Sequence, residues 1–363
     1  MSKTTSWGYE IVDSASNKPG DLAGTSADEE GVRALDIAVV IVTYRSAPLT
    51  IESLRSVQAE RSSSGLRVRA VVVDNASGDL SAIEQAVQAN DWQSWVTLVL
   101  APKNGGFAYG NNLGIDRAYA SGVPDYVYLL NPDAQVRAGA ISALVRFLET
   151  HPEVGIAGGI FENLDGSEWP IAFRFPGALS TLIDGLEIGL VARLLRRWQV
   201  AQNMTRKAQA VDWICGASML IRPAVLAAIG GLDENYFLYF EETDFCFRAR
   251  RAGFATWYVP ESRVMHIRGQ STTVTDETRG PKRLPIYWFE SRRRYFVVTA
   301  GMSHAMVIDI VALVTHSLGW LKRLALRRMH NGVPYFIRDL ARHSVLWPRN
   351  RHFPSIRHFS PPS

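Results

Sequence analysis

The sequence predicts an α/β fold in which a mixed, mainly parallel sheet is flanked by helices and followed by a helical C-terminal extension. Between residues 37 and 130, four short apolar runs alternate with stretches of helical spacing. Because the runs are apolar at consecutive positions, both faces of each strand are expected to be covered, as in parallel sheets. Beyond about residue 270 this alternation ends, and the remaining segments have the pattern of helices.

The first strands and helices are expected in regular alternation. In chain order, strands are predicted at 37–42, 69–73, 96–100 and 126–130, and helices at 49–58, at 80–89 and from Leu113 onward. Three of the four strands end in polar residues, which are Thr43 and Tyr44, Asp74 and Asn75, and Asn131, Pro132 and Asp133. In open α/β sheets ligands bind at the carboxyl ends of strands, so these residues predict a single cleft there.

The composition excludes several classes of protein. A chain of 363 residues with 47% hydrophobic content can form one large domain with an appendage, or two domains. The only cysteines, Cys215 and Cys246, lack metal-ligand spacing, so no disulfide framework or structural zinc site is predicted and a reducing, cytoplasmic setting is expected. The polar first 35 residues lack the regions of a secretory signal, and we interpret them as a mobile tail.

Charge is distributed unevenly along the chain. From Arg279 to the end there are 15 Lys and Arg against three acidic residues, a net charge of +12, whereas the rest of the chain carries −8. Anionic lipid surfaces and nucleic acid both attract such a basic segment, and the alternative is a solvated basic tail. It contains an apolar stretch at 306–321, which includes Asp309 and His316 and is short for a spanning helix. Two interpretations remain open: an interfacial helix whose basic end contacts lipid headgroups, or a helix packed on the main domain.

The polar strand ends and the segment 103–112 carry candidate ligands. The carboxylate of Asp74 can accept a hydrogen bond from the N–H of a pyrimidine base, although Asp-Asn after a strand is also common turn chemistry. Glycines in 103–112 permit close backbone approach, and amide groups at a helix start attract phosphate. Asp133 is placed to hold Mg²⁺ or Mn²⁺ beside a diphosphate, unless residues 131–133 form only a type I turn.

A run of three acids, Glu241, Glu242 and Asp244, lies between aromatic residues. Neighbouring like charges and burial both raise a carboxyl pKa, so one of these groups can act as a general base. In a helix over 241–250, Glu241 and Asp244 share a face and Glu242 does not. The alternative is a solvated acidic helix start. Further along, His266 is expected to follow a strand and supply a nitrogen ligand near Asp133, with Arg268 placed to contact phosphate.

Taken together and in order, seven segments resemble the family 2 glycosyltransferases, and most closely their rhamnosyltransferase-like branch. These segments are VIVTY, VVDNASGD, KNGGFAYGNN, LLNPD, WICGASMLIR, GGLDENYFLYFEETDFCFR and HIRGQS, within residues 37–271. The resemblance implies a GT-A (Rossmann-like) fold and single-displacement, inverting transfer from a nucleotide sugar. The chain departs from many relatives at Asn131, where they carry Asp, at Arg45, where Asn is frequent, and at Glu242, where Asp is common.

The resemblance also implies roles for individual residues. The implied nucleoside and donor contacts are Thr43, Tyr44, Asp74, Asn75, Asn104, Gly106 and Asn131. By the same resemblance, Asp133 and His266 bind a divalent cation, Mg²⁺ or Mn²⁺, together with the diphosphate. Glu242 is the implied base, with Glu241 and Asp244 shaping its surroundings. Trp213 and Gly216 are implied to line the acceptor side.

These patterns lead to one expected organisation and activity. We expect a tail at 1–35, a GT-A domain at 36–272 and a basic, mainly helical region at 273–363 that associates with a membrane. The expected enzyme is a hexosyltransferase that uses a dTDP- or UDP-sugar, with dTDP-rhamnose favoured, and a saccharide or lipid-linked saccharide acceptor in cell-surface polysaccharide synthesis. It is expected on the cytoplasmic face of the inner membrane, without a nucleic-acid partner, and a homo-oligomer is open.

Two other functions are kept as alternatives. One is an inactive membrane-associated scaffold derived from a transferase, against which the joint presence of Asp133, Glu242 and His266 argues. The other is a sugar-nucleotide pyrophosphorylase. That class needs an early Gly- and Arg-rich phosphate loop, which the segment VIVTYRSAP does not provide.

Overall fold

The computed structural model describes residues 33–169, 171–266, 282–327 and 332–356. Residues 34–363 belong to one compact unit. The tail expected at 1–35 lies almost wholly outside the described residues, and so does Arg268.

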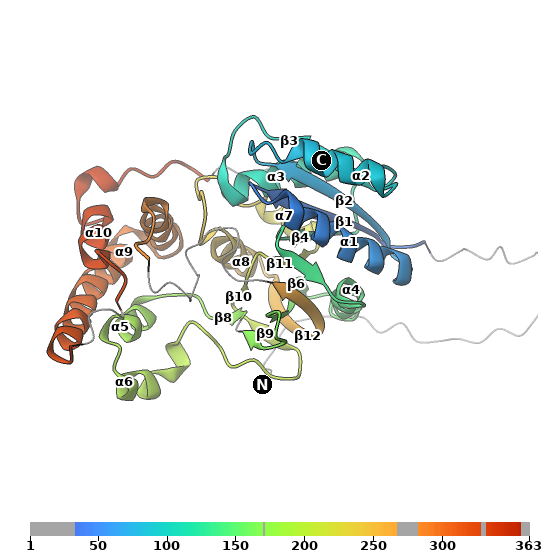
Figure 1. Cartoon of the computed structure of the whole chain (residues 1–363). Coiled ribbons are helices and arrows are strands. Elements are labelled where there is room, and N and C mark those ends of the chain that lie inside the picture. Colours follow the sequence, from blue (N-terminus) through green and yellow to red (C-terminus); the bar gives the residue numbers. More distant parts are fainter. Residues whose placement is uncertain (1–32, 170, 267–281, 328–331, 357–363) are drawn as a thin grey trace, which may run out of the picture. The chain divides into compact units, whose positions relative to one another are not determined.

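A mixed sheet forms the centre of the fold, in the order β3-β2-β1-β4-β11-β6-β12-β5 (Figure 1). Its strands are β1 (Asp36–Thr43), β2 (Arg67–Asp74), β3 (Val96–Leu100), β4 (Tyr126–Leu130), β5 (Ala134–Val136), β6 (Val154–Glu162), β11 (Ser218–Ile221) and β12 (Ala255–His266). The first four strands of this order are parallel, β11 is antiparallel to both neighbours, and β6 and β12 are parallel. The mixed, mainly parallel sheet predicted from the sequence is therefore confirmed.

Four short strands complete the β-structure. They are β7 (Glu168–Trp169), which pairs with β6, β9 (Gln209–Val211), which pairs with β12, and the separate antiparallel pair β8 (Ala172–Phe173) and β10 (Trp213–Ile214). The chain that follows β10 leads directly to the site described below.

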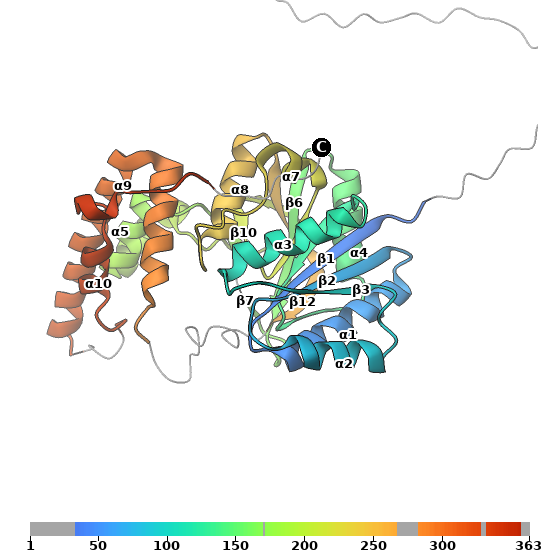
Figure 2. The ribbon, with the colours of Figure 1, turned by 90° about the horizontal axis from the view of Figure 1, so that it is seen from above.

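Helices cover both faces of the sheet. They are α1 (Ala47–Ser63), α2 (Leu80–Ala89), α3 (Gly106–Ala120), α4 (Ala140–Thr150), α7 (Pro223–Ile229) and α8 (Glu241–Arg251). Figure 2 shows α1 and α2 on one side of the parallel strands and α3 on the other. This arrangement explains the apolar runs: the β1 residues Ala38 and Ile41 point to opposite faces of the sheet, and both are fully buried.

Most predicted elements lie where the sequence placed them, but α3 does not. The strands at 96–100 and 126–130 and the helix at 80–89 have the predicted bounds. Helix α3 begins at Gly106, so the prediction of a helix from Leu113 is wrong and much of the Gly- and Asn-rich segment is helical. Glycine and asparagine are poor helix formers. Here close packing outweighs that preference, since Gly110 and Gly114 bring α3 against Val42 and Val40 of β1.

A helical region lies beside the sheet and is built from two parts of the chain, one between β8 and β9 and one after β12. It consists of α5 (Ala178–Leu186), α6 (Gly189–Leu194), a 3₁₀ turn at Arg196–Trp198, α9 (Ile286–Ala325), α10 (Phe336–His343) and a 3₁₀ turn at Pro348–Asn350. Helix α9 is broken at Gly301, which has φ 82° and ψ 164°. Arg292 forms a buried ion pair with Asp309. Seventeen residues of straight helix would separate these positions by about 25 Å, so the two arms of α9 run back along each other.

The apolar stretch at 306–321 belongs to the second arm of α9, residues 302–325. The arm is roughly 36 Å long at 1.5 Å per residue, so the stretch is part of a longer helix than the sequence suggested. By length and composition alone, α9 is long and apolar enough to cross a membrane.

Candidate functional site

A cavity of about 390 Å³ lies where β1, β2 and β4 end. Five of the residues predicted from the sequence line it: Tyr44, Asn75, Asn104, Gly106 and Asn131. The other lining residues are Pro132, which belongs to the polar strand ends noted in the sequence, and Val42, Ser46, Phe107, Phe237, Leu238 and Tyr287, which the sequence did not single out as site residues. The strand ends therefore converge on one cleft, as expected for an open α/β sheet.

Asn75 joins the end of β2 to the start of α3. Its Nδ2 donates to Asn104 Oδ1 at 3.1 Å and to the Gly106 carbonyl at 3.0 Å, and its Oδ1 accepts from the Gly105 amide at 3.3 Å. The Gly106 amide donates to Asn104 Oδ1, and the Phe107 amide donates to the Phe237 carbonyl. The amides of Gly105, Gly106 and Phe107 thus have protein acceptors in this structure, and contact between this helix start and a phosphate stays a prediction.

Gly106 allows the segment at Phe237 to form one wall of the cavity. Its φ is 87°, and a Cβ at this position would lie 1.9 Å from the Phe237 carbonyl oxygen. No other residue type fits both the left-handed backbone and this close approach. The predicted importance of Gly106 therefore has a steric basis.

Thr43 and Asp74 lie behind the cavity and do not line it. Both are fully buried. The Asp74 carboxylate accepts four hydrogen bonds, from the amide and hydroxyl of Ser77 and from the amides of Gly78 and Leu80. The Thr43 hydroxyl donates to Asp79 Oδ2 at 2.7 Å. In this structure both side chains shape the loops behind the cleft, and direct contact with a nucleoside stays a prediction.

Asp133, in the turn directly before β5, and His266, at the end of β12, are brought together by the pairing of these two strands. The register of β12 on β5 places His266 opposite Ala134, and His266 Nε2 lies 3.1 Å from Asp133 Oδ1. Asn131 Nδ2 is 3.5 Å from the same ring nitrogen. Both members of the pair are less than 10% exposed. A carboxylate oxygen and an imidazole nitrogen thus meet beside a residue that lines the cavity.

This pair fits a divalent cation that takes its remaining ligands from a substrate. Within residues 33–169, 171–266, 282–327 and 332–356, no group of three or more His, Cys, Asp or Glu side chains could hold a metal. Mg²⁺ is commonly bound by one or two protein groups, with phosphate oxygens and water completing the shell. The buried His266 Nδ1 has no hydrogen-bond partner among the described residues, so no second contact fixes the ring's tautomer.

Glu241 and Glu242 occupy the first turn of α8, after Tyr239 and Phe240, which both have positive φ. Burial raises the pKa of Glu242 to about 7, and a hydrogen bond from the Gly216 backbone amide opposes this shift. Burial and the neighbouring Glu242 charge raise the pKa of Glu241 well above its ordinary value. Glu242 therefore changes protonation near neutral pH, as a general base requires.

Cys215 and Gly216 lie between the acidic pair and the cavity. Burial, together with the charges of Glu242, Glu241 and Asp133, raises the pKa of the Cys215 thiol to about 12, so these carboxylates are close enough to act on it. A Cβ on Gly216 would lie 3.1 Å from the Phe107 ring and 3.5 Å from Glu242 Cβ. Gly216 therefore lies between Glu242 and Phe107, which lines the cavity.

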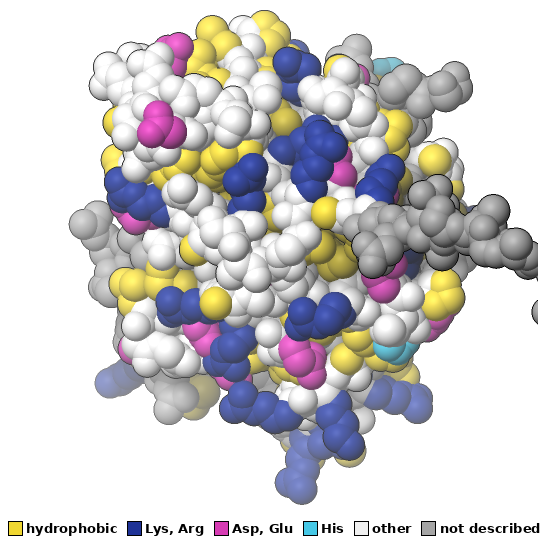
Figure 3. Space-filling view, turned by 90° about the vertical axis from the view of Figure 1, so that its right-hand side faces the viewer, with side chains coloured by type: hydrophobic (Ala, Val, Ile, Leu, Met, Phe, Trp, Pro, Cys, Tyr) yellow, Lys and Arg dark blue, Asp and Glu magenta, His cyan; other side chains and the backbone are white. Residues whose placement is uncertain are grey.

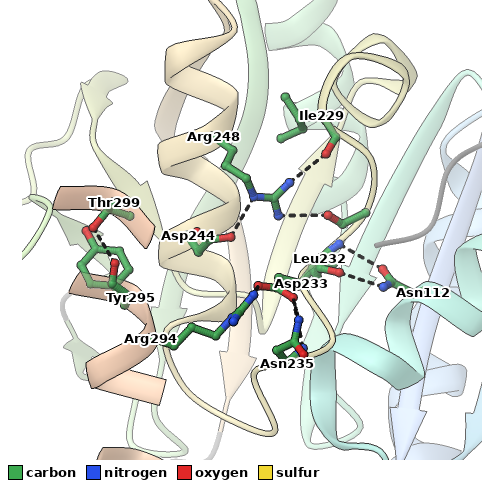
Figure 4. A network of polar contacts seen from close by, with 11 residues as sticks. Asn112, Ile229, Leu232, Asp233, Asn235, Asp244, Arg248, Arg294, Tyr295 and Thr299 are labelled. Carbon is green, nitrogen blue, oxygen red and sulfur yellow. Dashed lines mark hydrogen bonds and ion pairs between the residues drawn. The ribbon is translucent and has the colours of Figure 1, made fainter. Parts of the chain in front are cut away.

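Asp244 and Trp213 are not brought to the cavity. Asp244 is fully buried and pairs with Arg248 Nε at 2.8 Å, and Arg248 also donates to the carbonyls of Ile229 and Gly231 (Figure 4). The Trp213 ring stacks on Phe173, with centroids 4.3 Å apart, and its Nε1 donates to the Arg174 carbonyl. These contacts give Asp244 a structural environment and place Trp213 on the β8-β10 side.

Tyr287, from the first turn of α9, is a cavity residue that sequence reasoning missed. Its ring centroid lies 5.3 Å from that of Phe237 and 6.1 Å from that of Tyr239. The residue falls outside the segments that carry the family resemblance. Nothing local in the sequence around it distinguishes it from other helical aromatic residues.

Comparisons with known proteins identify the family of this chain. Residues 34–280 match the family model described as "Glycosyltransferase like family 2". An N-acetylglucosaminyl-diphospho-decaprenol L-rhamnosyltransferase of Mycobacterium tuberculosis is 30% identical over 254 residues, covering 65% of this chain and 77% of that protein. Rhamnosyltransferase WbbL of Escherichia coli is 25% identical over 164 residues, covering 44% and 60%.

A solved structure shares the fold. The structure of GalNAc-T7 with UDP, GalNAc and Mn²⁺ superposes with a TM-score of 0.51 at 14% identity, covering 85% of this chain and 57% of that one. At this identity the likeness concerns the fold alone.

Proposed function

The chain belongs to the glycosyltransferase-like family 2, and from that premise we propose that it transfers L-rhamnose, with inversion, from dTDP-rhamnose to a lipid-linked saccharide. It is a glycosyltransferase with the GT-A fold, and the sugar-nucleotide pyrophosphorylase alternative is set aside. The names of its relatives support rhamnose as the sugar. One of those names specifies a diphospho-decaprenol acceptor, which supports a lipid-linked acceptor in cell-surface polysaccharide synthesis.

The observation that carries the proposal is the position of Glu242 beside the cleft. The carboxyl has a pKa raised to about 7, one oxygen without a hydrogen-bond partner among the described residues, and a neighbour in Gly216, which packs on the cavity residue Phe107. We assign the cavity to the nucleotide part of the donor. Tyr44 is 40% exposed there, so its ring is available to stack on a base.

Asp133 and His266 are proposed to lie at the diphosphate. When bound between them, Mg²⁺ or Mn²⁺ would offset the negative charge of the leaving diphosphate. The two side chains come from the ends of neighbouring strands, so the sheet fixes their separation without a loop rearrangement. In the same scheme Asn131, which also lines the cavity, positions His266.

Glu242 is proposed to take the proton from the acceptor hydroxyl as that oxygen attacks the anomeric carbon. Attack comes from the face opposite the leaving diphosphate, so the anomeric configuration inverts. The proton ends on the Glu242 carboxylate, which must be ionised beforehand. Burial and the Glu242 charge raise the pKa of the neighbouring Glu241 as well, which disfavours two negative charges side by side. We keep the assignment of Gly216 to the acceptor side of the site, together with Trp213 of the preceding strand β10.

A donor screen tests the substrate part of the proposal. The melting temperature of the purified protein is measured with dTDP-, UDP- and GDP-sugars, because a ligand that binds only the folded state raises it. We expect the largest increase with dTDP-rhamnose, and transfer to a lipid-linked saccharide diphosphate detected by mass spectrometry. Turnover of a UDP- or GDP-sugar with dTDP-rhamnose inert would overturn the donor assignment. No transfer from any donor would leave the inactive-scaffold alternative standing.

A further inference from the structure

The second arm of α9 has an apolar face that no described part of the protein covers. Val307, Ile310, Val314, Leu318 and Leu321 are each about half exposed, between 49% and 53%. Their spacing of three or four residues places them on one side of the helix. The opposite side is buried and includes Ile308, Ala312, Thr315 and Gly319. One side of the arm is therefore packed on the protein, whereas its apolar outer side is left partly exposed.

Helix α6 adds a second apolar feature in a neighbouring segment. None of its residues is buried, and Ile188, Leu190 and Leu194 are 41%, 67% and 72% exposed. It directly follows α5, which lies beside α9 (Figures 1 and 2). The contact is close, since a Cβ on Gly319 would lie 2.2 Å from the Gly185 carbonyl oxygen, and Lys322 donates to the carbonyls of Leu186 and Glu187.

Exposed basic side chains are frequent in the segments that carry these apolar residues, although Asp184 of α5 is exposed as well. Arg193, Arg196, Arg197 and Arg327 are exposed, and the nearby Glu187 is paired with Lys322 and Arg323. The chain from Arg279 onward has a net charge of +12. Figure 3 shows the side of the molecule away from α9 and α10, where Lys and Arg are interspersed with Asp and Glu and hydrophobic side chains are exposed in separate groups.

We propose that Val307, Ile310, Val314, Leu318, Leu321, Leu190 and Leu194, here called the α6–α9 face, dock on an anionic lipid bilayer. An apolar helix face bordered by arginines matches an anionic membrane surface, with leucines among the acyl chains and guanidinium groups at the headgroups. A second copy of the chain is a poorer match, because it would bring the same arginines together.

The second arm of α9 lies in the plane of the membrane and does not cross it. Its inner side is fixed to the protein by polar contacts that crossing would break. Asp309 is 2% exposed, pairs with Arg292, and accepts hydrogen bonds from the Ser344 hydroxyl and the Val345 amide. Placing these groups in the hydrocarbon core without their partners would cost several kcal/mol for each.

Docking through this face also places the cleft near the membrane. The first arm of α9 supplies Tyr287 to the cavity, and Arg294 of the same arm pairs with Asp233 in the loop after α7 (Figure 4). Access to a membrane-held acceptor is a consequence that rests on the proposed function. The docking itself does not, and it is measured without any sugar nucleotide.

The test is co-sedimentation of the full chain with vesicles of phosphatidylcholine alone or with added anionic phosphatidylglycerol. We expect binding to the anionic vesicles that weakens as salt is raised. The variant Val314→Ser/Leu318→Ser/Leu321→Ser should bind about 100-fold more weakly, since three half-exposed apolar side chains are lost. Arg193→Gln/Arg196→Gln/Arg197→Gln should weaken binding about fivefold per arginine.

A matched control comes from the main domain. Leu100→Ser/Val123→Ser/Leu164→Ser removes three residues that are 60%, 60% and 71% exposed, and it should leave vesicle binding unchanged. The proposal is overturned by failure to bind anionic vesicles, or by equal loss of binding in the control. A dimer that the α9 variant dissociates, without vesicle binding, would assign the face to a second copy. Resistance of the membrane-bound protein to alkaline extraction would contradict the in-plane orientation.

Discussion

At the scale of single residues, the two carboxyls at the start of α8 have the most informative environment in the described chain. Glu242 has an ordinary pKa of 4.5 that burial raises to about 7, and Glu241 is shifted in the same direction. A buried carboxyl without a cationic partner resists ionisation. Asp244, three residues beyond Glu241, has Arg248 beside it. Asp244 therefore has a cationic partner, whereas no such partner is seen for Glu241 and Glu242 among the described residues.

The Glu242 environment predicts how stability depends on pH. The folded-state pKa lies above the unfolded-state value, so the folded protein binds more protons between pH 4.5 and about 7. Stability therefore falls as pH rises through this window, and the penalty is complete above about pH 7. Glu242→Gln should remove it, raising the free energy of unfolding by up to about 3 kcal/mol at pH 8 and by little near pH 4.5.

Urea unfolding at both pH values measures this effect. Glu84→Gln, an exposed substitution on α2, serves as the control and should show no pH-dependent gain. An equal change in Glu242→Gln at both pH values would mean that the carboxyl is not buried in the folded protein.

Asp133 gives a second prediction at this scale. Asp133→Asn removes the only carboxylate that the structure places against His266 Nε2, so Mn²⁺ should no longer strengthen nucleotide binding. We expect a loss of about 100-fold in that metal-dependent affinity, typical of losing a key metal ligand or its supporting group. Calorimetric titration of nucleotide with and without Mn²⁺ measures it. Asp116→Asn, on the exposed side of α3, is the control, and a metal effect unchanged in Asp133→Asn would remove this residue from the site.

At the scale of elements, local patterns predicted the strands well and the start of α3 badly. Buried runs such as 126–130 are visible because five consecutive apolar residues need cover on both faces. The start of α3 depends on distant partners, namely the side chain of Asn75 and the carbonyl of Phe237, which no local pattern reveals. The apolar stretch at 306–321 was visible, but its continuation into a two-armed helix depends on the Arg292–Asp309 pair.

In the candidate site, too, some residues could be predicted from local sequence patterns and others depend on distant partners. Tyr44, Asn75 and Asn131 were predictable because parallel strands end at one edge of the sheet. The internal bonding of Asp74 was not, since it depends on how residues 77–80 turn back toward the strand. Tyr287 comes from a helix far along the chain, so only the tertiary fold brings it to the cavity.

Gly106 tests the close approach at the start of α3. Gly106→Ala introduces a Cβ that would lie 1.9 Å from the Phe237 carbonyl oxygen, in addition to the strain of a positive φ. Gly253→Ala is a matched control, because Gly253 has φ 94° and nothing within 4 Å of the added Cβ. In urea unfolding we expect Gly106→Ala to cost at least about 2 kcal/mol more than Gly253→Ala. Equal losses of unfolding free energy in the two variants would show that the backbone at Phe237 shifts away from the added Cβ without a measurable penalty.

At the scale of the whole molecule, the helical C-terminal region is part of the folded unit that forms the site. Arg294 pairs with Asp233, Ser291 donates to the Leu238 carbonyl, and Tyr287 lines the cavity. A boundary at 272/273 was proposed from the sequence because the strand and helix alternation ends there. The contacts cross that boundary, and they support treating the first arm of α9 together with the catalytic domain.

The Arg294–Asp233 pair predicts strong coupling across this boundary. Both side chains are at most 5% exposed, so Arg294→Met leaves a buried carboxylate without this partner. We expect a loss of about 3–5 kcal/mol in unfolding free energy. Arg283→Met breaks the pair between the half-exposed Arg283 and Asp339. It should lower the unfolding free energy by no more than about 1 kcal/mol. Similar small losses in both variants would mean that the C-terminal region is only loosely attached.

The central claim is that Glu242 is the base for glycosyl transfer in this molecule. Its most direct test compares wild type with Glu242→Gln in a transfer assay with dTDP-rhamnose, a lipid-linked saccharide and Mn²⁺, while nucleotide binding is measured separately. For wild type the rate should rise with pH up to about 7, following ionisation of the carboxyl. Glu242→Gln should bind nucleotide normally and lose transfer by at least about 100-fold. Transfer at the wild-type rate in Glu242→Gln would contradict the account.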